Sequence, residues 1–403
     1  MDYRRRTFLA FWLFGVVNNV LYVVILSAAV DLLKDYPGVP KAAILMADIL
    51  PAFLAKIVAP FYLHSIPYPA RVSILIALSS TGMIVIAWYK RLNLIFIGVA
   101  FASLSSGLGE VTFLQLTHFY EDLSLKAFSS GTGGAGILGS FTYLTLTTFF
   151  GVPVPTALLL FSILPFSFAW SYFYLLPEKI PGYELIHAGS PASEPLDDQE
   201  ISNHSFSYDY WRFLALDLKV HLLYTFTRMK PLAAPYMLPL TTVYFSEYVI
   251  NQGVSPSLLF PLNEMPFEKF RDVYVVYSTL YQLGVFISRS SSSLVRIPHL
   301  KCLSVLQFTN LIICITQSMF YYIPNVYMMM LIIFYEGLLG GASYVNTFLS
   351  VLEETSLDQR EFAMGVVGIS DSAGIVLSAW FSIWLEPQLC QYQIQHGRPW
   401  CQP

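Results

Sequence analysis

Runs of about twenty mostly apolar residues follow one another along nearly the whole chain, and this feature restricts its fold more than any other. A helix of about twenty residues crosses the hydrocarbon core of a bilayer and satisfies its backbone hydrogen bonds without water. Only 12% of the 403 residues are charged, about half the share in a typical soluble domain, and the mean hydropathy is +0.58. The chain is therefore predicted to be an all-α polytopic membrane protein.

Charged residues and prolines divide the apolar runs into eleven predicted transmembrane helices, six before a long hydrophilic stretch and five after it. The predicted spans are residues 7–30, 41–62, 69–88, 92–119, 127–150, 156–176, 232–252, 270–290, 300–320, 325–352 and 362–385. The domain organisation that follows is a six-helix bundle over 1–176, a linker with an amphipathic helix over 177–231, a five-helix bundle over 232–386 and a tail over 387–403.

The hydrophilic stretch 177–210 is rich in proline, serine and acidic residues, which predicts a flexible cytosolic linker. The next segment, 210–230, carries Trp211, Leu214, Leu218 and Leu222 on one helical face. Two interpretations remain open for it. It is either an amphipathic helix lying in the membrane interface or a soluble helix packed against the bundle.

The distribution of lysine and arginine between the loops predicts the topology. Placing the N-terminus in the cytosol puts about twice as many of them on the cytosolic side, as the positive-inside rule requires. An odd number of spans then places the C-terminus in the lumen. There, Cys390 and Cys401 either form a disulfide or remain free in a short tail.

The two halves contain similar segments at offsets of 232 to 235 residues. The matching positions are Asn19 with Asn251, Lys56 with Arg289, residues 107–113 with 340–348, and residues 126–128 with 360–362. Because six spans return the chain to its starting side, these halves are predicted to be parallel repeats of the major-facilitator type. Such 6+5 pseudo-repeats would bind a ligand between the halves, near the middle of the membrane.

Several long motifs resemble those of the battenin (Batten disease protein) family, and the match looks closest to fungal members. The motifs are residues 130–136, 243–253, 284–291, 335–341 and 360–364. The resemblance implies a lysosomal or vacuolar membrane protein related to the major facilitators. It also implies roles in organelle pH, in basic amino-acid balance and in clearance of glycerophosphodiesters.

Ionisable side chains within the predicted spans are candidates for function, because each costs a few kcal/mol to place in a membrane. They include Asp48, Lys56, Glu110, Glu247, Glu336, Asp371 and, nearer a helix end, Arg289. A desolvated carboxyl group can exchange protons at physiological pH, so the candidates for proton coupling are Glu110, Glu247, Glu336 and Asp371. Glu110 and Glu336 are the preferred pair, since both lie in the middle third of equivalent helices. The alternative is that these acids only hold the helices together.

Lys56 and Arg289 occupy equivalent positions in the two halves and are predicted to converge on a phosphate. Alternatively, Lys56 extends to the cytosolic interface, while Arg289 contacts lipid phosphate or belongs to a gate. The full set of predicted substrate-binding residues is Asn18, Asn19, Lys56, Glu110, Gln115, Arg289, Glu336 and Asn346.

Residues 131–136 fit the GxGxxG pattern of dinucleotide-binding proteins, but they lie in an apolar helix with no preceding strand. Small residues in such a helix predict close packing against another membrane helix. The same interpretation applies to Gly365, Gly368, Ser372 and Gly374.

The remaining patterns exclude other classes of protein. The chain has no HExxH motif, no convincing nucleophile with a base, and no cysteine or histidine cluster, so no enzyme activity, metal or cofactor is predicted. A net charge of −4 gives no reason to expect nucleic acid. The predicted function is secondary transport of a small polar metabolite, such as a glycerophosphodiester or basic amino acid, coupled to protons. The alternative is a membrane regulator that acts on proton-pump or trafficking proteins through residues 177–230.

Overall fold

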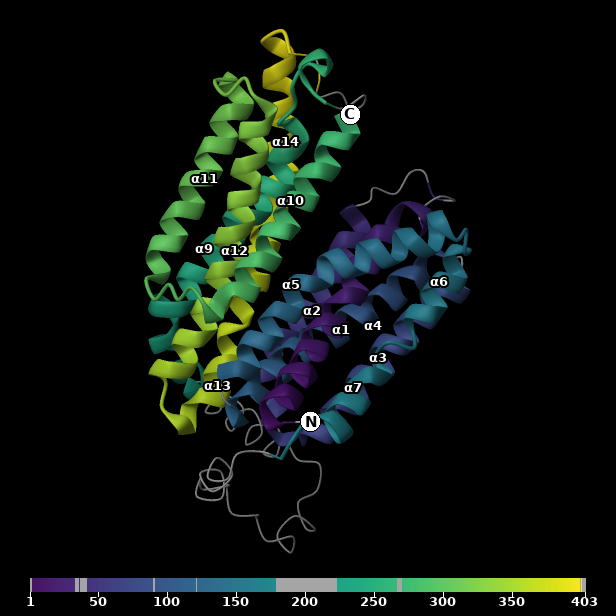
Figure 1. The fold of residues 1–403 in the computed structure, drawn as a ribbon, viewed down its shortest axis with the longest axis vertical. Coiled ribbons are helices and arrows are strands. Elements are labelled where there is room, and N and C mark those ends of the chain that lie inside the picture. Colours follow the sequence, from purple (N-terminus) through teal and green to yellow (C-terminus); the bar gives the residue numbers. More distant parts are fainter. Residues whose placement is uncertain are drawn as a thin grey trace, which may run out of the picture.

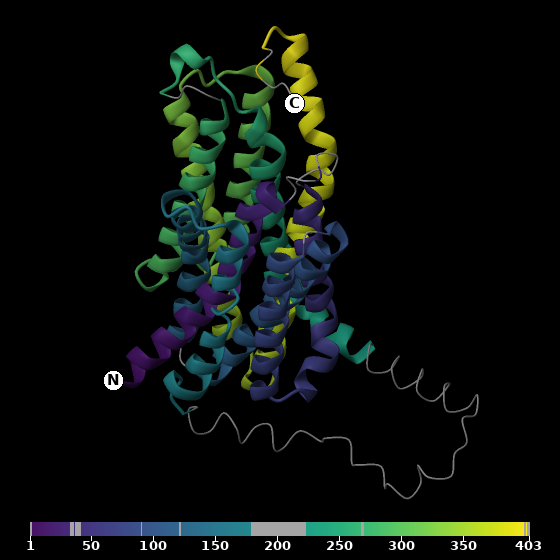
Figure 2. The ribbon, with the colours of Figure 1, turned by 90° about the vertical axis from the view of Figure 1, so that its right-hand side faces the viewer.

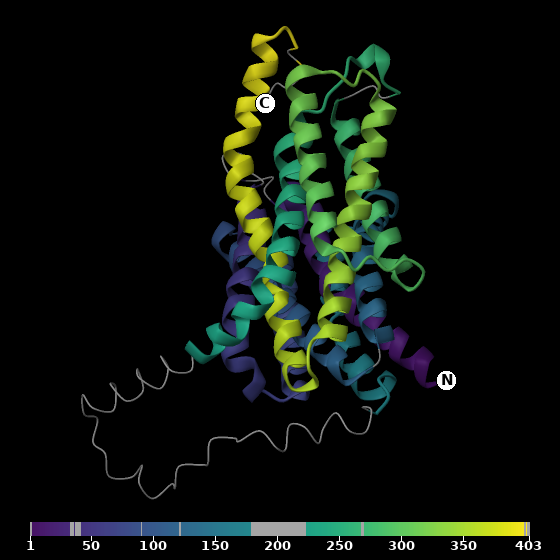
Figure 3. The ribbon, with the colours of Figure 1, turned by 90° about the vertical axis from the view of Figure 1, so that its left-hand side faces the viewer.

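The computed structural model describes residues 2–32, 36, 42–89, 91–120, 122–178, 223–266, 270–398 and 400, and the regular structure within them is helical throughout. Figure 1 shows two groups of long helices lying side by side, with the two chain ends at opposite ends of the molecule. The first group comes from the N-terminal half of the chain and faces the viewer in Figure 2. The second comes from the C-terminal half and faces the viewer in Figure 3.

The N-terminal half consists of five long helices and a sixth helical segment made of shorter pieces. The long helices are α1 (Tyr3–Leu32), α2 (Ala42–Tyr62), α3 (Tyr68–Trp88), α4 (Leu92–Leu116) and α5 (Asp122–Leu144). The sixth segment contains α6 (Val154–Phe161), α7 (Phe166–Trp170) and the π-helical turn Ser171–Leu175. The core of the N-terminal half is aromatic. The ring centres of Phe14 and Phe113 stack at 4.3 Å, and the ring centre of Phe168 lies 5.1 Å from that of Phe113.

The C-terminal half begins in the described residues with a helical stretch over 223–232. It continues with Ala233–Met237, α9 (Leu238–Tyr248), Val249–Val254, α10 (Phe270–Ser290), α11 (Leu300–Phe320), α12 (Val326–Glu354), α13 (Leu357–Val367) and α14 (Ile369–Gln395). The face proposed for the amphipathic helix, from Trp211 to Leu222, lies outside the described residues.

Seven helical segments of the described chain are long and apolar enough to cross a membrane. They are Tyr3–Ala28, Tyr68–Trp88, Leu92–Phe119, Val154–Leu175, Leu300–Phe320, Val326–Glu354 and Leu357–Gln395. Each of the other predicted spans also contains a helix, but that helix is not among these seven segments. These spans are 41–62, 127–150, 232–252 and 270–290. The polytopic all-α class is therefore confirmed, whereas the total of eleven spans remains a prediction.

The last helix differs from its predicted extent of 362–385. Helix starts earlier, breaks at Gly368 between α13 and α14, and continues through Pro387 to Gln395. The extension is anchored by Gln393, whose buried amide donates to the carbonyl oxygens of Ser257 and Ser318, both at 2.8 Å. The helix continues although Pro387 lacks a backbone donor and crowds the carbonyl group one turn earlier, and the contacts of Gln393 hold its last turns against the second half. Cys390 of this extension is disulfide-bonded, and Cys401, its predicted partner, lies outside the described residues.

Glycines allow the helices to approach closely, as predicted for residues 131–136. A Cβ atom added to Gly131 of α5 would overlap the carbonyl oxygen of Trp12 in α1, and one added to Gly15 would overlap that of Phe128. In α14, a Cβ atom at Gly374 would lie 2.7 Å from the carbonyl oxygen of Thr241. The packing prediction is therefore confirmed for Gly131 and Gly374, whereas a Cβ atom at Gly368 would meet nothing closer than 3.4 Å and Ser372 lines the cavity described below.

The two halves use the same contact at equivalent positions. A Cβ atom added to Gly107 of α4 would lie 2.6 Å from the carbonyl oxygen of Ala52 in α2. A Cβ atom added to Gly341 of α12 would lie 2.7 Å from that of Val285 in α10. Ala52 and Val285 are 233 residues apart, and the two glycines are 234 apart. These offsets fall within the range found in the sequence, so the predicted repeat has a counterpart in the helix packing.

Candidate functional site

A cavity of about 130 Å³ lies between the two halves. Its walls come from α1, α2 and α4 of the first half and from α9, α10, α12 and α14 of the second. Five charged residues line it: Asp48, Lys56, Glu110, Arg289 and Asp371. A polar chamber at the interface of two helix bundles has the form and position of a binding site for a small polar solute.

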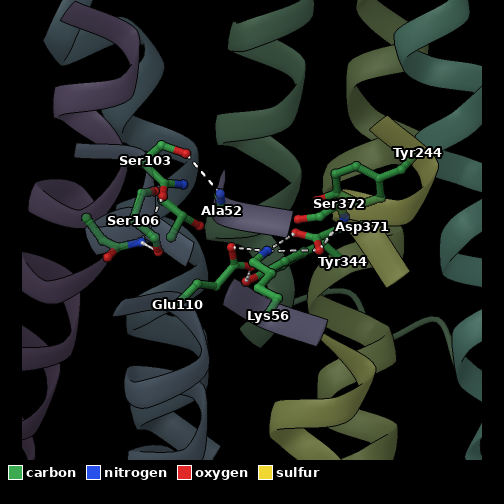
Figure 4. Close-up of polar contacts among 12 residues, drawn as sticks. Ala52, Lys56, Ser103, Ser106, Glu110, Tyr244, Tyr344, Asp371 and Ser372 are labelled. Atoms are coloured by element: carbon green, nitrogen blue, oxygen red, sulfur yellow. Dashed lines mark hydrogen bonds and ion pairs between the residues drawn. The ribbon is translucent and has the colours of Figure 1, made fainter. Parts of the chain in front are cut away.

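The centre of the cavity is an ion-pair cluster that joins the two halves (Figure 4). The Nζ atom of Lys56 lies 2.6 Å from Oε2 of Glu110 and 3.0 Å from Oδ1 of Asp371. Lys56 is only 2% exposed, so it does not extend to the interface as the alternative interpretation proposed. Buried ions are costly to desolvate, and in this cluster the attraction between oppositely charged partners offsets that cost.

Local helix geometry explains how this cluster forms. Because Gly107 has no side chain, α4 packs directly on Ala52 of α2, and Lys56 and Glu110 follow about one turn further along their helices. Asp371 arrives from the other half because the break at Gly368 places it in the first turn of α14. The positive end of that helix also stabilises its carboxylate.

Arg289 lies in the wall formed by the second half, where its hydrogen-bond partners are hydroxyl groups and Glu247 is close enough to interact with it electrostatically. Its Nη1 donates to Oγ1 of Thr132 at 2.6 Å, and its Nη2 donates to the hydroxyl of Tyr244 at 2.9 Å. The guanidinium carbon lies 4.1 Å from the centre of the Tyr344 ring, and the hydroxyl of Tyr344 donates to Oε1 of Glu110 at 2.9 Å. Arg289 is thus oriented by hydroxyls and an aromatic face, without a paired carboxylate in the described part of the chain.

Between the ion-pair cluster and α13, the interface between the halves is apolar. Leu114 and Phe128 of the first half share one buried cluster with Phe348, Met364 and Val366 of the second. These residues lie beyond the cavity in the direction of α13. They close the cavity at that end of the molecule.

Three of the predicted binding residues, Asn18, Gln115 and Asn346, do not belong to the cavity lining and have structural partners instead. Asn18 donates to Oδ1 of Asn19 at 3.2 Å, which supports the cavity wall, while Asn19 itself lines the cavity. Gln115 accepts from Arg71 at 2.8 Å, and Asn346 accepts from Arg296 at 2.7 Å. Gln115 and Asn346 therefore stabilise the helix ends nearest α13.

The preferred pair, Glu110 and Glu336, is divided between two sites. Glu336 does not line the cavity; it is fully buried in the second half, where its Oε1 accepts from Asn251 at 2.9 Å. Glu247 is its acidic neighbour, accepting from the hydroxyl of Tyr281 and packing against the backbone of Gly340. One carboxylate oxygen of each acid lacks a hydrogen-bond partner. The equivalent helices of the two halves thus hold different acid clusters.

Several cavity residues were not among the predicted binding residues. Tyr22, Tyr244, Tyr248 and Tyr344 all contribute to the lining. The chain contains 26 tyrosines, and nothing in the pattern separates these four from those at packing positions. Asp48 also lines the cavity, and the sequence could have identified it as a binding residue because it is an ionisable residue within a predicted span. Among the described residues, no group of three or more acidic, histidine or cysteine side chains is arranged to hold a metal.

Solved structures with the same architecture define the class. The human organic anion transporter MFSD10 matches with a TM-score of 0.64 and 13% identity, covering 99% of this chain and 98% of its own. The major facilitator FucP, in the outward conformation, matches with a TM-score of 0.59 and 13% identity, covering 99% and 94%. The molecule is therefore a polytopic membrane protein with the major-facilitator fold.

The chain belongs to the CLN3 protein family, whose model matches residues 9–392, so the resemblance to the battenin family is confirmed. Protein BTN1 of Yarrowia lipolytica is 56% identical over 97% of this chain and 96% of its own length. Protein BTN1 of Saccharomyces cerevisiae is 48% identical over 99% of each. Family and fold together support a transporter-type membrane protein.

Proposed function

We propose that this protein is a proton-coupled secondary transporter of a small polar metabolite in the vacuolar or lysosomal membrane. The observation that carries the proposal is the ion-pair cluster of Lys56 with Glu110 and Asp371. It joins the two halves inside a polar cavity, at the place where alternating access requires contacts that break and re-form. The proposed orientation has a cytosolic N-terminus and a lumenal C-terminus.

The cluster supplies a physical basis for coupling. Lys56 balances only one of its two carboxylates, so Glu110 and Asp371 together leave one negative charge to be neutralised. A proton or a cationic group of the solute can provide that charge. Either would weaken the hold of Lys56 on Asp371 and release the contact between the halves.

Two classes of cargo suit such a cavity: glycerophosphodiesters and basic amino acids. Both combine charged groups with a size that several hydrogen-bonding side chains can surround. Export of either class with protons would contribute to vacuolar pH and amino-acid balance. Membrane lipid surrounds the apolar helix faces, and proton-pump or trafficking proteins are the partners proposed for residues 177–230.

Transport by the purified full-length protein in liposomes tests this proposal. We expect flux of a glycerophosphodiester or of lysine that depends on an imposed pH gradient, and loss of most of that flux in Lys56→Gln. The matched control is Lys126→Gln, because Lys126 forms an exposed pair with Asp122 at 2.6 Å, away from the cavity. If neither class of solute moves, with or without a gradient, the transport function is wrong. A persisting effect on vacuolar pH would then favour the regulator.

A further inference from the structure

We propose that the cavity selects solutes that carry both a cationic and an anionic group, with the cation at Asp48 in the first half and the anion at Arg289 in the second. The inference rests on the transport function proposed above and narrows its substrate class. Two buried and opposite charges line the same cavity, and neither has an ionic partner among the described residues. A solute with both groups would satisfy both and bridge the two halves.

Asp48 presents an unpaired carboxylate to the cavity. It is 3% exposed, and its Oδ2 atom has no hydrogen-bond partner. A buried carboxylate without a partner is costly, and the ammonium group of a solute would remove that cost. Tyr22, which also lines the cavity, is close enough to Asp48 and to Tyr248 to interact with both, so tyrosine hydroxyls as well as the carboxylate are available near the proposed cation position.

The backbone of α2 is adapted at this position. The hydroxyl of Ser103 donates to the carbonyl oxygen of Asp48 and accepts from the N–H of Ala52 at 3.0 Å. In an uninterrupted helix, these two backbone groups would bond to each other. A side chain inserted there, next to Pro51, is a recognised cause of a helix kink, although α2 remains one continuous helix from Ala42 to Tyr62.

Arg289 provides the opposite pole. It is 9% exposed, and within the described part of the chain its two terminal nitrogens bond only to hydroxyls and its Nε atom has no hydrogen-bond partner. Hydroxyls and the Tyr344 ring orient the guanidinium but do not neutralise it. A planar guanidinium matches two oxygens of a phosphate or carboxylate. Lys56 is already paired with two carboxylates, so the acidic group of a solute is expected at Arg289 rather than between the two cations.

The charge balance of the cavity predicts what accompanies the solute. Among the described residues, three acids and two bases line it, which leaves one negative charge when all are ionised. A zwitterion of zero net charge does not change that balance, so one proton should enter with it. A basic amino acid carries the required positive charge itself and should enter without a proton.

Binding of matched probe pairs to the purified full-length protein tests the proposal. Glycerophosphoethanolamine is compared with glycerophosphoglycerol, which has hydroxyls in place of the ammonium group. Lysine is compared with cadaverine, which lacks the carboxylate. In one or both pairs, we expect the member that carries both a cationic and an anionic group to bind at least tenfold more tightly, as measured by calorimetry. The pair that shows the preference identifies the source of the acidic group, phosphodiester or carboxylate.

Two variants test where the cationic and the anionic group of the solute bind. Asp48→Asn should abolish the preference for glycerophosphoethanolamine, and Arg289→Gln should abolish the preference for lysine over cadaverine. The matched controls Asp122→Asn and Lys126→Gln alter an exposed pair on α5 and should retain both preferences. Absence of any preference in the wild type, or its survival in both cavity variants, would overturn the inference.

Transport of the same probe pairs, measured beside their binding, separates this inference from the proposed function. If a variant does not fold, the wild-type comparison within each probe pair still decides the outcome. If the wild type transports glycerophosphoglycerol or cadaverine as readily as the counterpart that carries charges of both signs, the transport function stands and the two-pole site is wrong. If nothing is transported or bound, both fail.

Discussion

The hydroxyl of Tyr68 in α3 donates a hydrogen bond of 2.7 Å to Oε1 of Glu361 in α13, across 293 residues of sequence. The bond ties the two halves together at the end of the molecule that the apolar cluster closes. The guanidinium carbon of Arg71 lies 4.2 Å from the centre of the Tyr68 ring and holds the ring in position. The ring of Tyr68 belongs to the buried apolar cluster, and its hydroxyl adds a polar contact between the halves at Glu361.

Removing this polar contact should favour the conformation that opens at the α13 end. Tyr68→Phe deletes only the hydroxyl, and loss of one hydrogen bond is worth about 1 kcal/mol, or about fivefold in population. The measurement is the rate at which a thiol reagent modifies a cysteine placed at Ala363, which is buried in this interface. The background variant Cys302→Ser removes an exposed free thiol. An unchanged rate would show that the hydroxyl does not contribute to closure.

Lys56→Gln is expected to destabilise the protein as well as impair transport. It leaves Glu110 and Asp371 buried without their cation, and breaking one partner of a buried pair costs about 3–5 kcal/mol. The loss should be greatest at neutral pH and smaller in acid, because protonated carboxyl groups need no cation. Thermal unfolding in detergent across this pH range provides the measurement.

The double variant Lys56→Gln with Asp371→Asn tests the cause of that loss. It removes one charge of each sign and should recover part of the melting temperature lost in the single variant. It should not recover transport, since the contact that responds to protons is gone. Equal instability of the two variants would mean that packing around residue 56, rather than charge, determines the effect.

The equivalent glycine contacts predict equivalent effects in the two halves. Alanine at Gly107 or Gly341 places a Cβ atom against a backbone carbonyl at 2.6 or 2.7 Å, so α2 must move from α4, or α10 from α12. Overpacking of this kind typically costs about 1–3 kcal/mol. Both variants should also reduce transport, because Gly107→Ala separates Lys56 from Glu110 and Gly341→Ala moves Arg289 of α10 relative to Tyr344 of α12.

Gly134→Ala is the control for these two variants. Its added Cβ atom would meet the ring of Phe286 at 3.3 Å, and a side chain can shift where a backbone cannot. We expect a loss of melting temperature well below that of either backbone contact. If all three variants behave alike, close approach of the helix backbones is not what these glycines provide.

The sequence was sufficient for the features that depend on local pattern. Apolar length located the helices, and the small residues of 131–136 located a close helix contact. The charged residues of the cavity could partly be predicted from the sequence, because charges within predicted spans are rare. Those identified in this way are Lys56, Glu110, Arg289 and Asp371. What the pattern did not reveal was the grouping of the acids. Glu110 and Glu336 occupy equivalent helices, yet each joins a separate cluster, since grouping depends on how the helices are rotated against their neighbours.

The acidic pair of the second half predicts a different response to pH from that of the central cluster. Glu336 is fully buried beside Glu247, and each has one carboxylate oxygen without a hydrogen-bond partner. Asn251 can satisfy one oxygen of Glu336 at 2.9 Å but cannot neutralise a charge. Two negative charges in this apolar setting would repel each other, so at least one carboxyl group should keep its proton near neutral pH.

Glu336→Gln is therefore expected to preserve the fold and to stabilise it in alkaline conditions. Glutamine resembles a protonated glutamic acid in shape, and it cannot acquire the second negative charge as pH rises. The wild type should lose melting temperature between neutral and alkaline pH, and the variant should lose several degrees less, while the two proteins should behave alike in acid. Glu353→Gln, at an exposed ion pair with Arg296, is the matched control and should follow the wild type. A variant that is less stable than the wild type at every pH would instead mean that Glu336 is ionised and bound by its neighbours.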